Sequence, residues 1–141
     1  MIILSKTLFA KLCEHGKEAY PEECCGAMLG DIDSESGIKS ITELIRIENK
    51  SEENKHRRFA ITPNDYRALE KQATAKSLHL LGFYHTHPDH PCRPSQTDLT
   101  YAWPVFSYII LSINKGEPSE CRSFVLDTQS KQLTNETLID K

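Results

Sequence analysis

Leu78-His79-Leu80-Leu81-Gly82-Phe83-Tyr84-His85-Thr86-His87-Pro88 is the stretch of this sequence that decides both the fold and the site. Its first part, residues 78–85, is short and apolar, which is typical of a buried β-strand. Residues i and i+2 of a strand project from the same face. We therefore expect His85 and His87 to point the same way at the end of a core strand.

A hydroxyl and a carboxylate follow the two histidines. Ser95 and Asp98 come after a proline-rich loop, at the start of a short helix that we predict over residues 95–102. Two imidazoles and one carboxylate leave a fourth zinc position for water, as in hydrolytic zinc sites. Ser95 and Asp98 also match a helix capping box. We expect Ser95 to cap the helix, and Asp98 to bind metal with His85 and His87.

A hydrolytic site also needs a general base beside the attacking water. Glu22 and Glu23 precede an apolar run over residues 24–29. Burial at the start of a core strand raises the pKa of a carboxyl group toward the range in which a general base works. The residues alone leave the choice between Glu22 and Glu23 open.

The rest of the chain predicts an α/β domain. Ser5 can cap a first helix that Pro21 ends, and Pro63 suits the first position of a second. Strands outnumber helices and are interspersed with them, which favours one domain over residues 1–141, with a mixed sheet and helices packed on it. The predicted helices cover 5–20 and 62–77, and the predicted strands cover 23–29, 38–47, 58–61, 78–85, 106–113 and 121–126, with an edge strand over 132–139.

Composition excludes several classes of function. The 141 residues carry a formal net charge of −3 and no basic run, which argues against nucleic acid or an anionic membrane as a partner. No apolar stretch reaches the length of a membrane span. Five cysteines, an odd number, do not suit a disulfide framework, so we expect a cytoplasmic protein.

Two segments together resemble a known family. His85-Thr86-His87-Pro88, six further residues and Ser95-Gln96-Thr97-Asp98 resemble the motif of the JAMM (MPN+) zinc metalloproteases, in their small prokaryotic form. The segment from Pro21 to Gly30 resembles the family's Pro-x-Glu-x-Cys-Gly-x-x-x-Gly pattern. The resemblance covers about residues 5 to 130, and it selects Glu23 over Glu22.

The resemblance implies a cytidine-deaminase-like fold, a curved mixed sheet flanked by helices. It implies zinc-dependent hydrolysis of a peptide or isopeptide bond at the Gly-Gly tail of a ubiquitin-like or sulfur-carrier protein. By the same resemblance, His85, His87 and Asp98 hold Zn²⁺, Glu23 serves as the general base, and Ser95 stabilises the oxyanion.

Two other functions compete with this one. Cys92 lies in the loop between the ligands, and its thiolate in the fourth metal position would displace the water. The domain would then be a non-catalytic, zinc-stabilised module that binds a ubiquitin-like tail. A zinc deaminase ranks last, because its Pro-Cys-x-x-Cys ligand segment does not occur in this sequence.

Overall fold

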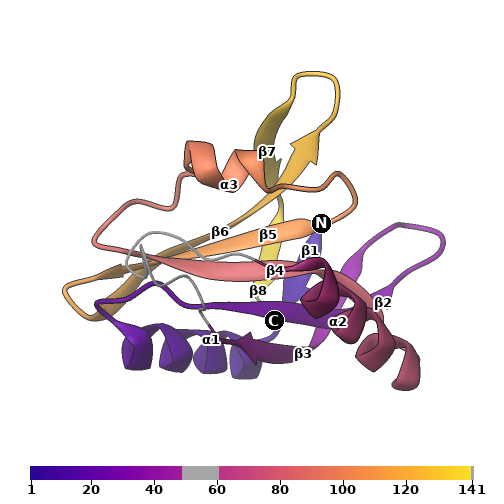
Figure 1. Ribbon diagram of the computed structural model, residues 1–141, viewed down its shortest axis with the longest axis horizontal. Helices are drawn as coiled ribbons and strands as arrows, with labels where there is room; N and C mark the ends of the chain where they lie inside the picture. The colour runs from indigo at the N-terminus through magenta and orange to yellow at the C-terminus, as the bar shows by residue number, and fades with distance from the viewer. Residues whose placement is uncertain (49–60, 141) are drawn as a thin grey trace.

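The computed structural model describes residues 1–48 and 61–140, in which one mixed sheet is flanked by helices (Figure 1). The strands lie in the order β7-β6-β5-β4-β2-β3-β1-β8. The predicted α/β domain with a curved mixed sheet is confirmed. The elements are β1 (Ile2–Leu4), α1 (Lys6–Ala19), β2 (Cys25–Ile32), β3 (Lys39–Ile47), α2 (Pro63–Ala75), β4 (His79–Pro88), α3 (Gln96–Thr100), β5 (Ser107–Asn114), β6 (Glu117–Asp127), β7 (Gln132–Glu136) and β8 (Leu138–Asp140).

The strand that carries the histidines is the central one. β4 pairs antiparallel with β2 on one side and parallel with β5 on the other. All its residues from Leu81 to Pro88 are buried. A strand covered on both faces has no polar side to present to water, which explains the continuous apolar run. The strand predicted over 78–85 is confirmed, and it continues through both histidines.

The helices α1 and α2 cover opposite faces of the sheet. Neighbouring strand residues project to opposite faces. Tyr84 packs in the cluster that contains the buried residues of α1, whereas Phe83 packs in the cluster that contains α2. His85 and His87 continue the alternation that Phe83 begins, so they face the α2 side. Thr86, between them, faces α1.

Both long helices begin where the sequence predicts. Ser5 caps α1, since its hydroxyl accepts a hydrogen bond from the Leu8 amide at 3.2 Å, and the helix ends before Pro21. Thr62 and Asp65 form a reciprocal capping box at the start of α2. These local hydrogen bonds satisfy amides that have no partner within the helix.

The sheet curves until its two edges meet. β7 and β8 are separated only by Thr137, yet they lie at opposite edges of the sheet. The Ile2 amide donates to the Thr137 carbonyl at 2.9 Å. Across the curve, Lys39 of β3 donates to the Ser107 hydroxyl of β5 at 2.6 Å. The prediction of one edge strand over 132–139 is therefore wrong, because the segment changes edges in its middle.

Other boundaries differ from the predictions or fall outside the described residues. β2 begins two residues later than predicted and continues through Gly30 to Ile32. The predicted strand over 58–61 lies outside the described residues except for Ile61, which is not in a strand. All five cysteines are free thiols. Within residues 1–48 and 61–140, no helix has both the length and the apolar character needed to cross a membrane.

Candidate metal centre

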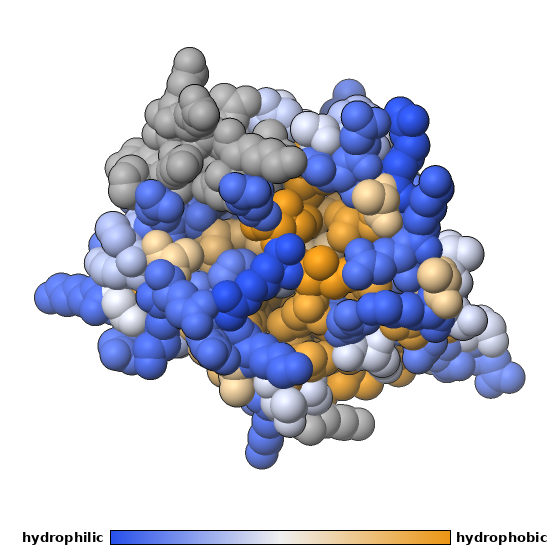
Figure 2. Space-filling view, turned by 60° about the horizontal axis from the view of Figure 1, so that its bottom comes forward, coloured by the Kyte–Doolittle hydropathy of each residue, from blue (hydrophilic) through white to orange (hydrophobic). Residues whose placement is uncertain are grey.

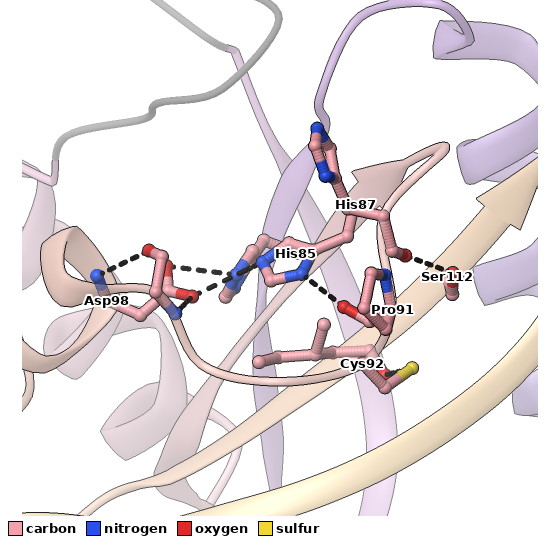
Figure 3. Close-up of polar contacts among 9 residues, drawn as sticks. His85, His87, Pro91, Cys92, Asp98 and Ser112 are labelled. Carbon is pink, nitrogen blue, oxygen red and sulfur yellow. Dashed lines mark hydrogen bonds and ion pairs between the residues drawn. The ribbon is translucent and has the colours of Figure 1, made fainter.

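Three potential ligands converge at the end of β4. The Nε2 atoms of His85 and His87 lie 3.0 Å apart. Asp98 Oδ1 lies 3.1 Å from His85 Nε2, and Asp98 Oδ2 lies 3.2 Å from His87 Nε2 (Figure 3). Tetrahedral ligands at about 2.0–2.1 Å from zinc sit roughly 3.4 Å from one another. These three distances are therefore close to those between ligand atoms around one zinc ion.

The hydrogen bonding of His87 supports the same conclusion. His87 Nδ1 lies 2.9 Å from the Pro91 carbonyl oxygen. A carbonyl only accepts, so Nδ1 carries the proton, and in the neutral ring Nε2 offers its lone pair to the centre. A backbone carbonyl behind a metal-binding histidine is a common way to fix the ring. The donor set of two imidazoles and one carboxylate fits zinc.

Asp98 serves both the helix cap and the centre. The Ser95 amide donates to Asp98 Oδ2 at 2.8 Å, and the Asp98 amide donates to Ser95 Oγ at 3.0 Å. The two roles do not compete, because one carboxylate has enough lone pairs for both. Burial would raise the pKa of Asp98, but its contacts with the imidazoles of His85 and His87 hold it well below its usual value. Asp98 is therefore ionised and ready to bind a cation.

Glu23 is buried beside the centre, two residues before the start of β2. Only 5% of its surface is exposed, and this burial raises the pKa of its carboxyl group to about 8, although nearby His87 acts in the opposite direction. Glu22 is exposed. The pairing of Cys25 with His85 across β2 and β4 places the start of β2 next to the ligands. Of the two glutamates that the sequence offered, Glu23, the one selected by the resemblance, is the one that is buried beside the potential ligands.

Cys92 is turned away from the centre. Its thiol is 2% exposed, and it donates to the backbone carbonyl of Glu120 at 2.7 Å and to that of Ile110 at 3.3 Å. Figure 3 shows its sulfur directed away from the two imidazoles. The cluster of potential ligand atoms contains His85, His87 and Asp98 but not this thiol. The sulfur ligand on which the non-catalytic module depended is therefore not supplied by Cys92.

Thr86 makes contacts with Cys24 that the sequence did not reveal. Its amide donates to the Cys24 carbonyl at 3.0 Å, and its hydroxyl accepts from the Cys24 amide at 2.9 Å. Cys24 directly follows Glu23, so Thr86 holds the backbone that carries the carboxylate. The alternation of strand residues could have indicated this, since a residue between two ligands on one face must point to the other.

Two hollows meet at the centre, and Glu23 lines both. The larger, of about 390 Å³, extends from His85 and Asp98 across aromatic side chains that include Tyr66 and Trp103. These two rings stack at a centroid distance of 5.5 Å. The space-filling view in Figure 2 shows how one face of the molecule is hollowed, with hydrophobic side chains inside and hydrophilic ones around the rim.

The smaller hollow, of about 230 Å³, lies on the His87 side. It contains Ser95 together with the exposed side chains of His90 and Arg93. The sequence identified His85, His87, Asp98, Glu23 and Ser95 as candidates, but it did not reveal the two hollows, which are built from segments far apart in the chain.

Comparison with known families identifies this arrangement. Residues 5–127 match the family described as prokaryotic homologs of the JAB domain. The chain belongs to this prokaryotic JAB family. The match covers most of the chain and includes every residue of the centre. It confirms the resemblance to the small prokaryotic JAMM/MPN proteins that the two sequence motifs indicated.

Individual relatives of this JAB domain agree in fold. A solution structure of a protein from Desulfitobacterium hafniense matches with a TM-score of 0.84 and 27% identity, covering 100% of this chain and 93% of that one. A JAB1/MPN domain protein from Archaeoglobus fulgidus matches with a TM-score of 0.62 and 20% identity, covering 100% and 97%. The second likeness shows that the curved sheet and its helices are those of the JAB1/MPN fold.

One relative is named after an enzymatic activity. The JAB domain is 29% identical over 93 residues to a desampylase from Haloferax volcanii. The aligned part covers 65% of this chain and 63% of the desampylase. The match therefore spans less than two thirds of that relative.

Proposed function

We propose that this JAB domain is a zinc-dependent hydrolase that cleaves a peptide or isopeptide bond at the Gly-Gly tail of a ubiquitin-like or sulfur-carrier protein in the cytoplasm. The observation that carries the proposal is the convergence of His85, His87 and Asp98 beside a buried Glu23. The name of the desampylase relative supports a ubiquitin-like modifier as the substrate. His85, His87 and Asp98 would hold the zinc.

Zinc in such a centre supplies a Lewis acid and makes water acidic enough to attack at neutral pH. Glu23 would take the proton of the attacking water, and its raised pKa suits a group that accepts a proton and later returns it. The proton then goes to the amine as the carbon–nitrogen bond breaks. Burial of Glu23 also limits competition from bulk water.

Ser95 would stabilise the oxyanion that forms on the substrate carbonyl. Its oxygen accepts a hydrogen bond from the Asp98 amide, which leaves the hydroxyl proton available for donation into the smaller hollow. The helix cap thereby orients a donor in advance. Such preorganised donors are effective because they need no rearrangement during the reaction.

The test uses the zinc-loaded protein and the host's own small proteins that end in Gly-Gly. These would be presented as linear fusions, as cysteine adducts and as lysine conjugates, and the products would be read by intact mass. We expect cleavage of at least one class by the wild-type protein. Absence of cleavage in all three classes would refute the proposal.

Glu23→Gln, with Glu22→Gln as the matched control, tests the general base. We expect Glu23→Gln to retain zinc but to lose about 10²- to 10⁴-fold in turnover, the usual contribution of general acid–base catalysis. Glu22 is exposed and lines neither hollow, so its variant should stay near wild-type activity. Near-normal turnover in Glu23→Gln would reject this residue as the base.

A further inference from the structure

Two buried polar side chains meet behind the metal centre, on the face of β4 that α1 covers (Figure 1). Tyr84 precedes His85 on the strand and therefore points to the opposite face. Its hydroxyl lies 2.7 Å from Nδ1 of His15, a residue of α1. Tyr84 is 1% exposed and His15 is 9% exposed, and their rings meet edge to face. Neither side chain has a part in the proposed hydrolysis.

Tyr84 is held at both of its ends. It is paired with Gly26 of β2, and a Cβ atom at Gly26 would lie only 2.2 Å from two carbon atoms of the tyrosine ring. The ring therefore occupies the space that any side chain at Gly26 would fill. Its hydroxyl forms the hydrogen bond to His15. The position of Tyr84 is thus fixed by β2 at the ring and by α1 at the hydroxyl.

The next residue of α1 approaches the same strand. A Cβ atom at Gly16 would lie 3.1 Å from the Thr86 methyl group and 2.8 Å from Cδ1 of Ile113. Consecutive residues of the helix, His15 and Gly16, therefore lie against Tyr84 and Thr86 of β4. In the chain, Tyr84 and Thr86 are the two neighbours of His85, and Thr86 also separates it from His87. The helix consequently supports the backbone on both sides of a potential ligand.

The hydrogen bond between His15 and Tyr84 differs in kind from the apolar packing around it. Burial lowers the pKa of His15 to about 4, so the ring is neutral at pH 7 and offers one donor and one acceptor. Apolar contacts are not directional and change little when one element slides slightly over another. A hydrogen bond weakens steeply when its geometry is lost. The contact between His15 and Tyr84 therefore fixes where the helix sits along β4.

We propose that His15 is a positioning residue for the metal centre, which acts through Tyr84 to hold the end of β4 where His85 and His87 can bind one zinc ion together. The inference rests on the proposed zinc centre and adds a residue that lines neither hollow. Zinc–nitrogen bonds have a narrow range of lengths, about 2.0–2.1 Å, so a small shift of the strand weakens binding.

Zinc affinity is the quantity that this inference predicts. The dissociation constant would be measured at neutral pH by competition with a chelator of known affinity. Loss of a group that orients a ligand typically weakens metal binding about 10- to 100-fold. His15 acts through the strand and not on a ligand ring, so we expect the lower end, about tenfold, for His15→Leu and for Tyr84→Phe. His15→Asn should restore affinity close to that of the wild-type protein, because its amide can take the place of Nδ1.

Ser123→Ala is the matched control for the simple loss of a buried hydrogen bond. Ser123 is 1% exposed, and its hydroxyl donates to Glu136 at 2.9 Å, between β6 and β7. This variant should have a lower Tm but an unchanged zinc dissociation constant. Apparent affinity depends on the fraction of molecules in the binding-competent state, and that fraction hardly changes while the domain remains almost fully folded.

The double variant His15→Leu/Tyr84→Phe separates positioning from stability. It removes both partners of the hydrogen bond, so no buried polar group is left unpaired by the substitutions. Its Tm should exceed that of His15→Leu, whereas its zinc affinity should stay as low, because the link between α1 and β4 is still missing. Recovery of zinc affinity in the double variant would overturn the inference.

Three other results would also overturn it. These are a wild-type dissociation constant in both His15→Leu and Tyr84→Phe, an affinity in His15→Asn as low as in His15→Leu, and a loss in Ser123→Ala equal to theirs. Assays of carrier cleavage on the same proteins separate the inference from the proposed hydrolase. Lowered affinity in the two variants supports the role of His15 even if no carrier is cleaved. Unchanged affinity rejects that role even if carriers are cleaved, and a wild-type protein that binds no zinc rejects both.

Discussion

Replacement of Thr86 should show how the backbone that carries Glu23 is held in place. Thr86 is fully buried, and its hydroxyl accepts the Cys24 amide at 2.9 Å. Thr86→Val keeps the shape of the side chain but leaves this buried amide without its acceptor. The cost of such a loss is about 1–3 kcal/mol. At about 4 °C per kcal/mol for a domain of this size, Tm should fall by roughly 4–12 °C.

Activity should respond more sharply than stability. A misplacement of about 1 Å can cost on the order of 10²-fold in rate, so we expect Thr86→Val to lose tenfold or more in kcat through a shift of Glu23. Thr86→Ser is the control, because it keeps the hydroxyl and loses only a methyl group, at a cost of about 1 kcal/mol in stability. Thermal unfolding and steady-state kinetics provide the two measurements. Wild-type Tm and kcat in Thr86→Val would refute the proposal that Thr86 holds the backbone of Glu23 in place.

Three further substitutions test other parts of the structure. Burial, with a smaller contribution from Arg46, lowers the pKa of His15 to about 4. The unfolded chain therefore binds more protons than the native state between pH 6.5 and pH 4, and stability should fall by up to about 3 kcal/mol as the pH drops through this window. Urea unfolding of His15→Asn should show a weaker pH dependence there, and an unchanged one would contradict the assignment. His87→Ala should reduce zinc content measured by metal analysis, whereas full stoichiometry would argue against this ligand. Ser95→Ala should lower kcat on the order of 10²-fold with little change in KM, as for other oxyanion donors, and a pure KM effect would indicate substrate positioning instead.

The parts of the fold that local signals determine were predictable. α1 follows from a capping serine and a terminating proline, because both act on their own helix. β4 follows from its apolar run, because the strand is buried on both faces. The candidate site was predictable for a related reason. His85 and His87 are neighbours on one strand face, and Asp98 lies only eleven residues beyond His87.

The parts that depend on distant segments were not predictable. The sequence predicts that a strand ends at Gly30. In the structure Gly30 lies inside β2, where any larger side chain would overlap the Ser40 backbone of β3. Cys92 could be assigned to the metal only because its true partners, the carbonyls of Ile110 and Glu120, belong to other strands. A single sequence carries no local signal for such contacts.

The pairing of the first strand with the last has a consequence for biosynthesis. Ile2 of β1 lies opposite Leu138 of β8, so one side of β1 has no partner until the final strand has been translated. Contacts of such long sequence separation also slow folding, because a long loop must close before they form. The apolar strand β1 is therefore exposed to aggregation while the rest of the domain is being synthesised. Variants that weaken the pairing of β1 with β8 should therefore reduce the yield of folded protein in cells. In the molecules that do fold, the cluster of His85, His87 and Asp98 should be unaffected.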